Sequence, residues 1–388
     1  MAILRIGMLG GLRSGLLRSL GVAMLAASLS GCALWGGRTA KPVAAELGPN
    51  VAVLGVRQAW TARVGRIELP LEVHVNGNVV TVASSDGVVA ALDARSGSDV
   101  WRSSLGESLS TGAGSDGKTA AVVTRANYLV ALESGREKWR QQLPAQVFTP
   151  PLVAGGRIFV LSADRSVAAY DGSTGRRLWS QQRPGEPLVL RQAGVLLAVG
   201  DTLVVGFSGR MVGLNPNTGV PQWELPLASP RGTNDVERLV ELVGRVSRVG
   251  DSVCARAFQA SVGCVNVARS AVAWAQPAGG SEGVHGDDRA VFGTESNGVV
   301  VAWNRVDGSR LWAIDRYKHR KLTAPLLLGR SVVFGDDSGT VHLLSRDDGA
   351  PLNRLATDGS GIAAAPAVAS DTLVVVSRNG SVYGFRPD

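Results

Sequence analysis

Short apolar runs alternate along the chain with turns rich in Gly, Asp and Asn. Val-rich runs of this kind, with no long stretch of helical periodicity, predict β-strands and an all-β fold. One pattern keeps returning: an apolar strand ends in Leu92-Asp93, a turn closes on Gly97, and a second strand opens with Trp101. The pattern Leu-Asp-x-x-[Ser/Thr]-Gly-x-x-x-Trp is therefore interpreted as a structural repeat.

The tryptophan of this pattern recurs with a period near 40 residues. Equivalent positions are Trp101, Trp139, Trp179, Trp223, Trp274 and Trp312, at spacings of 38, 40, 44, 51 and 38 residues. A seventh copy has Asn353 at the tryptophan position, and an eighth stops at Asp388 before its turn and last strand. Units of this length, with two strands on either side of each turn, predict four-stranded propeller blades.

The strand that the eighth copy lacks has a candidate at the other end of the chain. Residues 59–65 resemble the tryptophan strand of the other copies through Trp60 and precede the first full unit. Pairing this strand with the last copy would close the ring and leave no open sheet between the first and last blades. We expect an all-β, eight-bladed propeller with four-stranded antiparallel blades over residues 56–388, closed by an N-terminal strand that completes the last blade.

The first 31 residues form a separate segment. Three arginines precede an apolar run over residues 20–29, and Ser30-Gly31-Cys32 follows. This is typical of a bacterial lipoprotein signal peptide, which is cleaved directly before a cysteine. We expect a signal peptide over 1–31, lipidation of Cys32 and a flexible tether over 32–55. A retained transmembrane helix is the alternative, but the apolar run is short for a bilayer.

Charge and cysteine usage agree with an exported protein. The formal net charge of +8 falls to about +5 without the three leader arginines, and nucleic acid is not an expected partner. Basic residues are scattered among acids except at 316–321, which is either a solvated loop or a site for anionic lipid or an acidic partner. Cys254 and Cys264 lie in consecutive apolar runs, so a disulfide across a hairpin is one outcome that export permits.

Two other motifs compete with the repeat. Residues 112–119 match the phosphate-loop pattern G-x-x-x-x-G-K-[ST], but a strand-like run follows instead of a helix, and Gly117 falls at a turn position of the repeat. Residues 279–283 match G-x-S-x-G without the strand–turn–helix context of a hydrolase. The four histidines show no ligand spacing. No catalytic residue, metal site or cofactor is predicted.

Two interruptions of the repeat are more informative. Pro187 to Gln192 lie between Trp179 and Trp223, and the longest insertion, with Asn234 to Gly244, follows Trp223. Extra length on neighbouring blades often builds a binding face. The alternative is that both segments only supply the first strands of their blades.

The lipobox, the eight repeats and the closure together resemble the pyrroloquinoline-quinone-type propeller superfamily. Within it, residues 29–388 resemble the BamB family, lipoproteins of the outer-membrane β-barrel assembly (BAM) machinery, through Leu188-x-Leu190-Arg191 and the stretch from Glu237 to Glu241. The resemblance implies that Leu188, Leu190 and Arg191 dock on the periplasmic POTRA domains of BamA. Glu241 would be the first acid of a pair, whereas Val243 occupies the second position.

The same resemblance implies a non-catalytic scaffold without a cofactor. It would be lipid-anchored in the outer membrane, face the periplasm, and work with other BAM subunits and unfolded outer-membrane clients. By resemblance to bacterial lipoproteins, Ala33 after the cysteine favours the outer membrane.

Two rival functions stay open at this point. A quinoprotein dehydrogenase of the same superfamily would bring a calcium-bound quinone and commonly a vicinal cysteine pair, but this chain has no adjacent cysteines and is short for those enzymes. The other rival is a propeller that binds another envelope protein or a cell-wall glycan.

Overall fold

The computed structural model describes residues 42–184, 188–230, 233–235 and 238–388. The chain divides into two units, Met1–Val43 and Ala44–Asp388. The expected signal peptide and Cys32 lie outside the described residues. Within the described ranges, no helix has the length and apolar character needed to span a bilayer.

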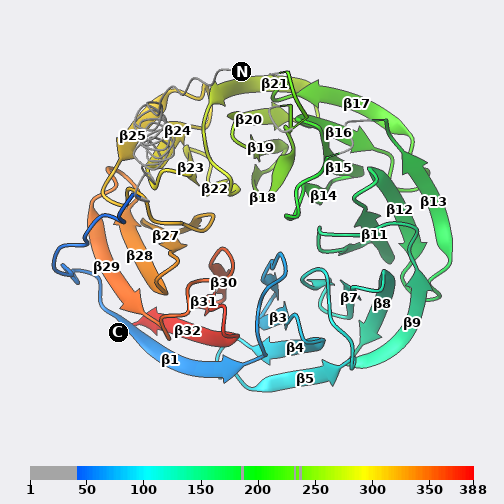
Figure 1. Cartoon of the computed structure of the whole chain (residues 1–388), viewed down its shortest axis with the longest axis horizontal. Coiled ribbons are helices and arrows are strands. Elements are labelled where there is room, and N and C mark those ends of the chain that lie inside the picture. Colours follow the sequence, from blue (N-terminus) through cyan, green and yellow to red (C-terminus); the bar gives the residue numbers. More distant parts are fainter. Residues whose placement is uncertain (1–41, 185–187, 231–232, 236–237) are drawn as a thin grey trace, which may run out of the picture. The chain divides into compact units, whose positions relative to one another are not determined.

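Ala44–Asp388 contains eight four-stranded antiparallel sheets arranged around a central axis (Figure 1). This confirms the predicted eight-bladed propeller. Blades one to four are β2 (His74–Asn76), β3 (Val79–Ala83), β4 (Val88–Asp93), β5 (Asp99–Ser104); β6 (Gly114–Ser115), β7 (Thr119–Val123), β8 (Tyr128–Glu133), β9 (Arg136–Gln142); β10 (Leu152–Ala154), β11 (Arg157–Leu161), β12 (Ser166–Asp171), β13 (Arg177–Gln182); β14 (Leu196–Val199), β15 (Thr202–Phe207), β16 (Arg210–Leu214) and β17 (Pro221–Pro226). Blades five to eight are β18 (Leu242–Val249), β19 (Ser252–Ala257), β20 (Ser261–Asn266), β21 (Ala271–Pro277); β22 (Val284–Gly286), β23 (Ala290–Thr294), β24 (Val300–Asn304), β25 (Arg310–Ile314); β26 (Leu326–Leu328), β27 (Ser331–Gly335), β28 (Thr340–Ser345), β29 (Pro351–Ala356); β30 (Ala367–Ala369), β31 (Thr372–Val376), β32 (Ser381–Pro387) and β1 (Val56–Arg63).

Blade eight joins the two ends of the chain. Its strand order is β1-β32-β31-β30, and β1 pairs antiparallel with β32 from Val56 opposite Pro387 to Arg63 opposite Ser381. Figure 1 shows the blue first strand alongside the red last strand. The predicted closure by an N-terminal strand is confirmed.

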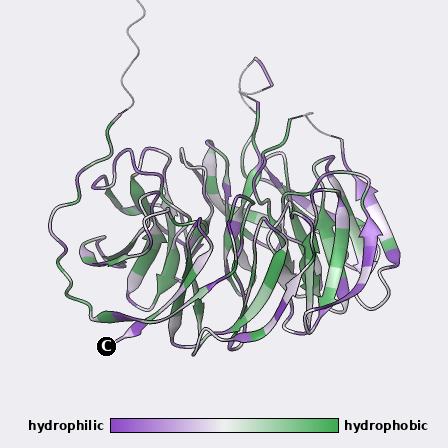
Figure 2. Cartoon of the chain, turned by 60° about the horizontal axis from the view of Figure 1, so that its bottom comes forward, coloured by the Kyte–Doolittle hydropathy of each residue, from purple (hydrophilic) through white to green (hydrophobic). Residues whose placement is uncertain are grey.

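The core lies between blades, in the two middle strands of each sheet. Every residue of β7 is buried, whereas the outermost strand β9 is mostly exposed. Figure 2 shows hydrophobic strands inside the ring and hydrophilic residues on its outer strands. Because both faces of a middle strand meet neighbouring sheets, these strands are continuous apolar runs instead of alternating ones.

The repeated Trp and Gly of the sequence pattern interlock successive blades. Trp60 of blade eight donates its Nε1–H to the Ala94 carbonyl in the outer turn of blade one, at 2.8 Å. Its ring covers Gly97, whose φ is 72° and where a Cβ would overlap the ring. The corresponding tryptophan–carbonyl pairs are Trp139–Gly172, Trp179–Pro216, Trp274–Arg305 and Trp312–Arg346. The pattern is therefore a connector between blades.

The segment before β1 lies along blade seven. The Ala45 amide donates to the Lys318 carbonyl and the Val53 amide to the Leu352 carbonyl, both at 2.9 Å. Asn353 donates its Nδ2–H to the Leu54 carbonyl at 2.6 Å. The described end of the segment expected to be a tether is thus bonded to the propeller.

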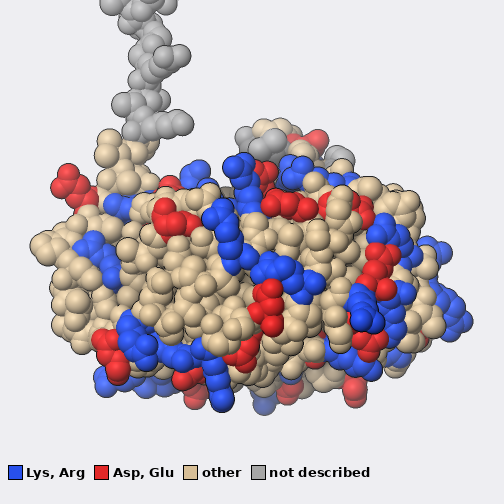
Figure 3. Space-filling model, turned by 90° about the horizontal axis from the view of Figure 1, so that it is seen from below, with Lys and Arg blue, Asp and Glu red and all other residues tan. Residues whose placement is uncertain are grey.

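The basic run 316–321 is only partly available to a partner. Tyr317 is buried, and Lys318 pairs with Asp315 at 2.6 Å. Arg320 donates to the Ala45 carbonyl and pairs with Asp336 at 3.1 Å. On the side of the molecule seen in Figure 3, basic and acidic side chains are interspersed. The run is not a continuous cationic surface.

The residues that match a phosphate loop form an ordinary hairpin. Gly114 and Ser115 make up β6, Gly117 has a φ of 92° in the turn, and the buried strand β7 follows. Asp116 accepts hydrogen bonds from the Lys118 and Thr119 amides, so the turn is closed by its own side chain. The β-turn interpretation of this motif is confirmed.

Candidate functional site

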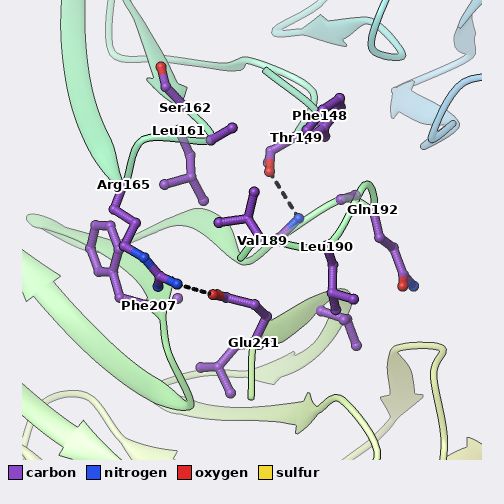
Figure 4. A pocket seen from close by; sticks show the side chains of 16 residues that line it. Phe148, Thr149, Leu161, Ser162, Arg165, Val189, Leu190, Gln192, Phe207 and Glu241 are labelled. Atoms are coloured by element: carbon purple, nitrogen blue, oxygen red, sulfur yellow. Dashed lines mark hydrogen bonds and ion pairs between the residues drawn. The ribbon is translucent and has the colours of Figure 1, made fainter. Parts of the chain in front are cut away.

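The loop of residues 188–194, which we call the docking loop, connects β13 of blade three to β14 of blade four. Leu188 is 39% exposed and Arg191 is also exposed. Val189 and Leu190 are half-buried and line a small cavity of about 50 Å³ together with Phe148 (Figure 4). The loop therefore presents one apolar side chain and one cation to solvent on an apolar base.

Hydrogen bonds to three other parts of the chain hold the docking loop. The Gly194 amide donates to Thr149 Oγ1 at 2.9 Å, as Figure 4 shows. Gln192 donates its Nε2–H to the Ser281 carbonyl at 2.7 Å, and Ala193 accepts from the Gly244 amide at 2.9 Å. Such support from separate blades gives the loop a defined conformation.

A buried arginine connects the two predicted binding segments. Arg165, in the turn between β11 and β12, donates to the Leu188 carbonyl at 3.2 Å and pairs with Glu241 at 2.9 Å. It also hydrogen-bonds the Ser208 hydroxyl, and the Ser208 amide donates to Glu241. The Arg165–Glu241 pair thus joins the docking loop to the insertion before β18 (Figure 4).

Glu241 is mostly buried and supports the docking loop through Arg165. Only 15% of its side chain is exposed, and its carboxylate faces Arg165. Burial raises the pKa of the Glu241 carboxyl, while the Arg165 charge and the Ser208 amide act in the opposite direction. The structure therefore brings Glu241 to the docking loop through Arg165, beneath the exposed residues.

The position that corresponds to the second acid of the pair is Val243, and it does not contribute to the surface. Val243 is 1% exposed and pairs with Arg256 within the sheet of blade five, so a side chain at this position points into protein. Glu237 lies outside the described residues. Among the described residues, Leu188 and Arg191 are the exposed members of the predicted set.

Arg165 was not predicted, although the repeat contains a signal for it. It has a φ of 64° in the turn between the second and third strands of its blade. Other blades also have a positive-φ residue at the equivalent position, namely Gly87, Asn127, Gly209, Gly298, Gly339 and Gly380. A long charged side chain where most blades use glycine indicates a special contact, because left-handed backbone disfavours side chains.

The glycine-rich loop 279–283 accommodates a second buried arginine. Arg256 on β19 is fully buried and donates to Glu295 at 2.9 Å. A Cβ on Gly280 would overlap the Arg256 guanidinium. These glycines therefore have a packing role, in agreement with the rejection of the hydrolase motif.

The remaining candidate residues give no further chemical site. Cys254 and Cys264 lie opposite each other on β19 and β20 and are joined by a disulfide in the structure. Within the described ranges, no three His, Cys, Asp or Glu side chains are grouped so as to hold a metal ion. An exposed leucine and arginine on a braced loop are suited to binding another protein.

Comparison with known proteins identifies the family of the chain. The sequence profile described as "Outer membrane protein assembly factor BamB" matches residues 85–314. The protein of that name from Burkholderia pseudomallei is 39% identical over 373 residues, covering 94% of this chain and 97% of that protein.

Two solved structures share the fold. BamB from Moraxella catarrhalis has a TM-score of 0.78 at 23% identity, covering 85% of this chain and 99% of that one. The quinohemoprotein alcohol dehydrogenase of Comamonas testosteroni has a TM-score of 0.66 at 15% identity, covering 86% of this chain and 77% of that one. At these identities both structures bear on the fold alone. Through the profile and the Burkholderia relative, the chain belongs to the BamB family of outer membrane protein assembly factors, which are not catalytic.

Proposed function

We propose that this assembly factor binds the periplasmic POTRA domains of BamA through Leu188, Leu190 and Arg191. Membership of the BamB family implies a place in the BAM complex. The observation that supports the proposed partner surface is the braced docking loop, with exposed Leu188 and Arg191 on a base held by three blades. Preorganised loops lose little entropy on binding, so such a surface suits a stable complex.

The proposed residues contribute in different ways. Leu188 supplies apolar area that a partner pocket can bury, and Arg191 supplies directed hydrogen bonds. Leu190 packs at the base of the loop, so its loss would disturb the loop as well as the interface. Glu241 acts through Arg165, which holds the Leu188 carbonyl.

A photocrosslinking amino acid at position 188 tests this surface in intact cells. We expect a BamA adduct from position 188 and none from position 311, a leucine that is 51% exposed on the outer strand of blade six. Adducts from both positions, or from position 311 alone, would contradict the proposal. Leu188→Ala should in addition lower co-purification of BamA without changing thermal unfolding.

We further propose that Cys32 is lipidated and anchors the protein on the periplasmic side of the outer membrane. The support is the lipobox at residues 29–32. Metabolic labelling with a palmitate analogue should label the parent chain, and Cys32→Ala should lose the label and leave the membrane fraction. A labelled Cys32→Ala protein would refute this assignment.

A further inference from the structure

The propeller has a cavity of about 820 Å³ beside the docking loop, which we call the axial cavity. Loops from blades one, two, six, seven and eight and the strand β18 line it, together with Arg191 and Gln192 of the docking loop. This volume lies within the range of pockets that enclose a small ligand or a few side chains. Since Arg191 belongs to both features, the cavity is continuous with the proposed interface.

Arginines dominate one side of the axial cavity. Blades two to five contribute Arg125, Arg191 and Arg245 to the described lining and no carboxylate. The carboxylates Glu68, Glu72 and Glu282 come from the loops that lead into blades one and six. Arg378, from the turn between β31 and β32, completes the set of arginines. A positive arc therefore extends from the docking loop into the cavity.

The guanidinium groups of this arc have unused hydrogen-bonding capacity. Arg245 donates to the Pro366 carbonyl at 2.7 Å, and Arg191 lies over the Phe148 ring at 6.0 Å. Among the described residues, no salt bridge involves Arg125, Arg191, Arg245 or Arg378. Two carboxylates on the other side of the cavity act on arginines of this set: the charge of Glu72 acts on Arg245, and Arg378 opposes the effect of burial, which raises the pKa of the Glu282 carboxyl.

We infer that the axial cavity receives an acidic segment of a protein that docks on the loop of residues 188–194. Guanidinium groups bind carboxylates through paired, charge-assisted hydrogen bonds, and the side of the cavity lined by blades two to five has arginines and no carboxylate in its described lining, so it attracts negative charge. The neighbouring apolar Leu188 favours a protein over a free anion, because it offers a second contact outside the cavity. This inference rests on the proposed function and names the chemistry of the partner.

The experiment uses the full mature chain in detergent and a fluorescent peptide of alternating Glu and Ala. We expect saturable binding by anisotropy that weakens with salt, and no binding of the Gln counterpart of the peptide. Arg125→Gln and Arg378→Gln should each weaken peptide binding about tenfold. Arg330→Gln is the matched control, because this arginine is 91% exposed in a turn on the opposite face and should leave binding unchanged.

Binding of uncharged peptides, the control variant and competing anions can each contradict the inference. Equal binding of the Gln peptide, or equal weakening by Arg330→Gln, would show that the cavity does not recognise carboxylates. Displacement of the peptide by inorganic phosphate or anionic lipid vesicles at matched charge would assign the cavity to phosphate groups. Leu188→Ala separates the two proposals: it should lower BamA binding and leave peptide binding intact.

Discussion

Arg165 combines an unfavourable backbone conformation with stabilising side-chain contacts. Its positive φ is unfavourable for a side chain by about 1 kcal/mol, since only glycine adopts this backbone freely. Its guanidinium, in turn, neutralises the buried Glu241 and holds the Leu188 carbonyl. The strain at Arg165 is therefore offset by contacts that order the docking loop.

A double-mutant cycle at Arg165 and Glu241 tests this balance. Arg165→Gly should relieve the backbone strain yet lower the free energy of unfolding by about 2–4 kcal/mol, because a buried carboxylate loses its partner. Adding Glu241→Gln should restore part of that loss, since no uncompensated charge remains. Urea unfolding measures both changes. If Arg165→Gly proved as stable as the parent, the pair would have no supporting role.

The interruption of the repeat locates the segment of the proposed docking loop in the sequence, and the resemblance to the BamB family singles out Leu188, Leu190 and Arg191 within it. Leu188 and Arg191 interrupt it in a short segment that can be read locally. Glu241 is buried against Arg165, which lies about two blades earlier in the chain, and the sequence around Glu241 does not show this pairing. The glycine position occupied by Arg165 is the one local sign of it.

At the scale of elements, the contact between an outer tryptophan and the next turn explains why the tryptophan recurs in the repeat. It also explains why blade seven has Asn353 at this position. In most blades the outer tryptophan donates a hydrogen bond to the outer turn of the next blade. Blade eight has no such turn, because its two outer strands β32 and β1 are the chain ends. Blade seven accordingly has Asn353, which bonds the Leu54 carbonyl just before β1. The absence of the tryptophan can be seen in the sequence, but its cause can be understood only from the structure of the neighbouring blade eight.

Replacing single tryptophans with alanine should show how much each tryptophan-to-turn contact contributes to the free energy of unfolding. Trp274 is buried and donates to the Arg305 carbonyl at 2.8 Å, so Trp274→Ala should cost about 3–5 kcal/mol. Trp101 is only half-buried, and among the described residues its indole nitrogen has no hydrogen bond, so Trp101→Ala should cost clearly less. Equal losses in urea unfolding would contradict the role of the turn contact.

His285 makes the contact between blades six and seven sensitive to acid. Its Nδ1 accepts a hydrogen bond from the Leu327 amide at 3.0 Å, which requires that this nitrogen carry no proton. Burial, aided by the charges of Arg245 and Arg305, lowers the pKa of His285 to about 3. The unfolded chain, with the ordinary value near 6.5, therefore binds the proton more readily than the folded chain.

The free energy of unfolding should thus fall as the pH drops from about 6.5 toward 3, by a few kcal/mol in total. His285→Asn keeps an acceptor for the Leu327 amide but does not titrate. This variant should lose that part of the pH dependence in urea unfolding at pH 7.5 and pH 5. An unchanged pH profile would show that His285 does not cause it.

At the scale of the whole molecule, the pairing of β1 with β32 determines whether the ring is closed. Both strands are held in one sheet, although they lie at opposite ends of the sequence. The order of the blades and the closure were predictable because every copy carries the same strand pattern. The path of residues 44–55 along blade seven was not, since most groups that the segment itself contributes to these bonds are backbone amides and carbonyls, which any sequence possesses.

Deleting residues 381–388 should open the ring. Without β32, the strand β1 has no partner in the sheet and β31 keeps only β30, so we expect a lower melting temperature, a less cooperative transition and rapid proteolysis. Deleting Asp388 alone, which lies beyond β32, is the control and should have little effect. A truncated chain that melted like the parent would exclude a stabilising role for the closure.

This closure also means that β1 can pair only after β32 has been synthesised. Ribosomes synthesise β1 first and β32 last, so the first strand stays without its partner until translation has passed residue 387. A product shortened by a premature stop codon retains an unpaired strand at its beginning and lacks the sheet that accepts it. Unfinished copies should therefore be cleaved by proteases faster than finished ones, because an unpaired strand is accessible to cleavage.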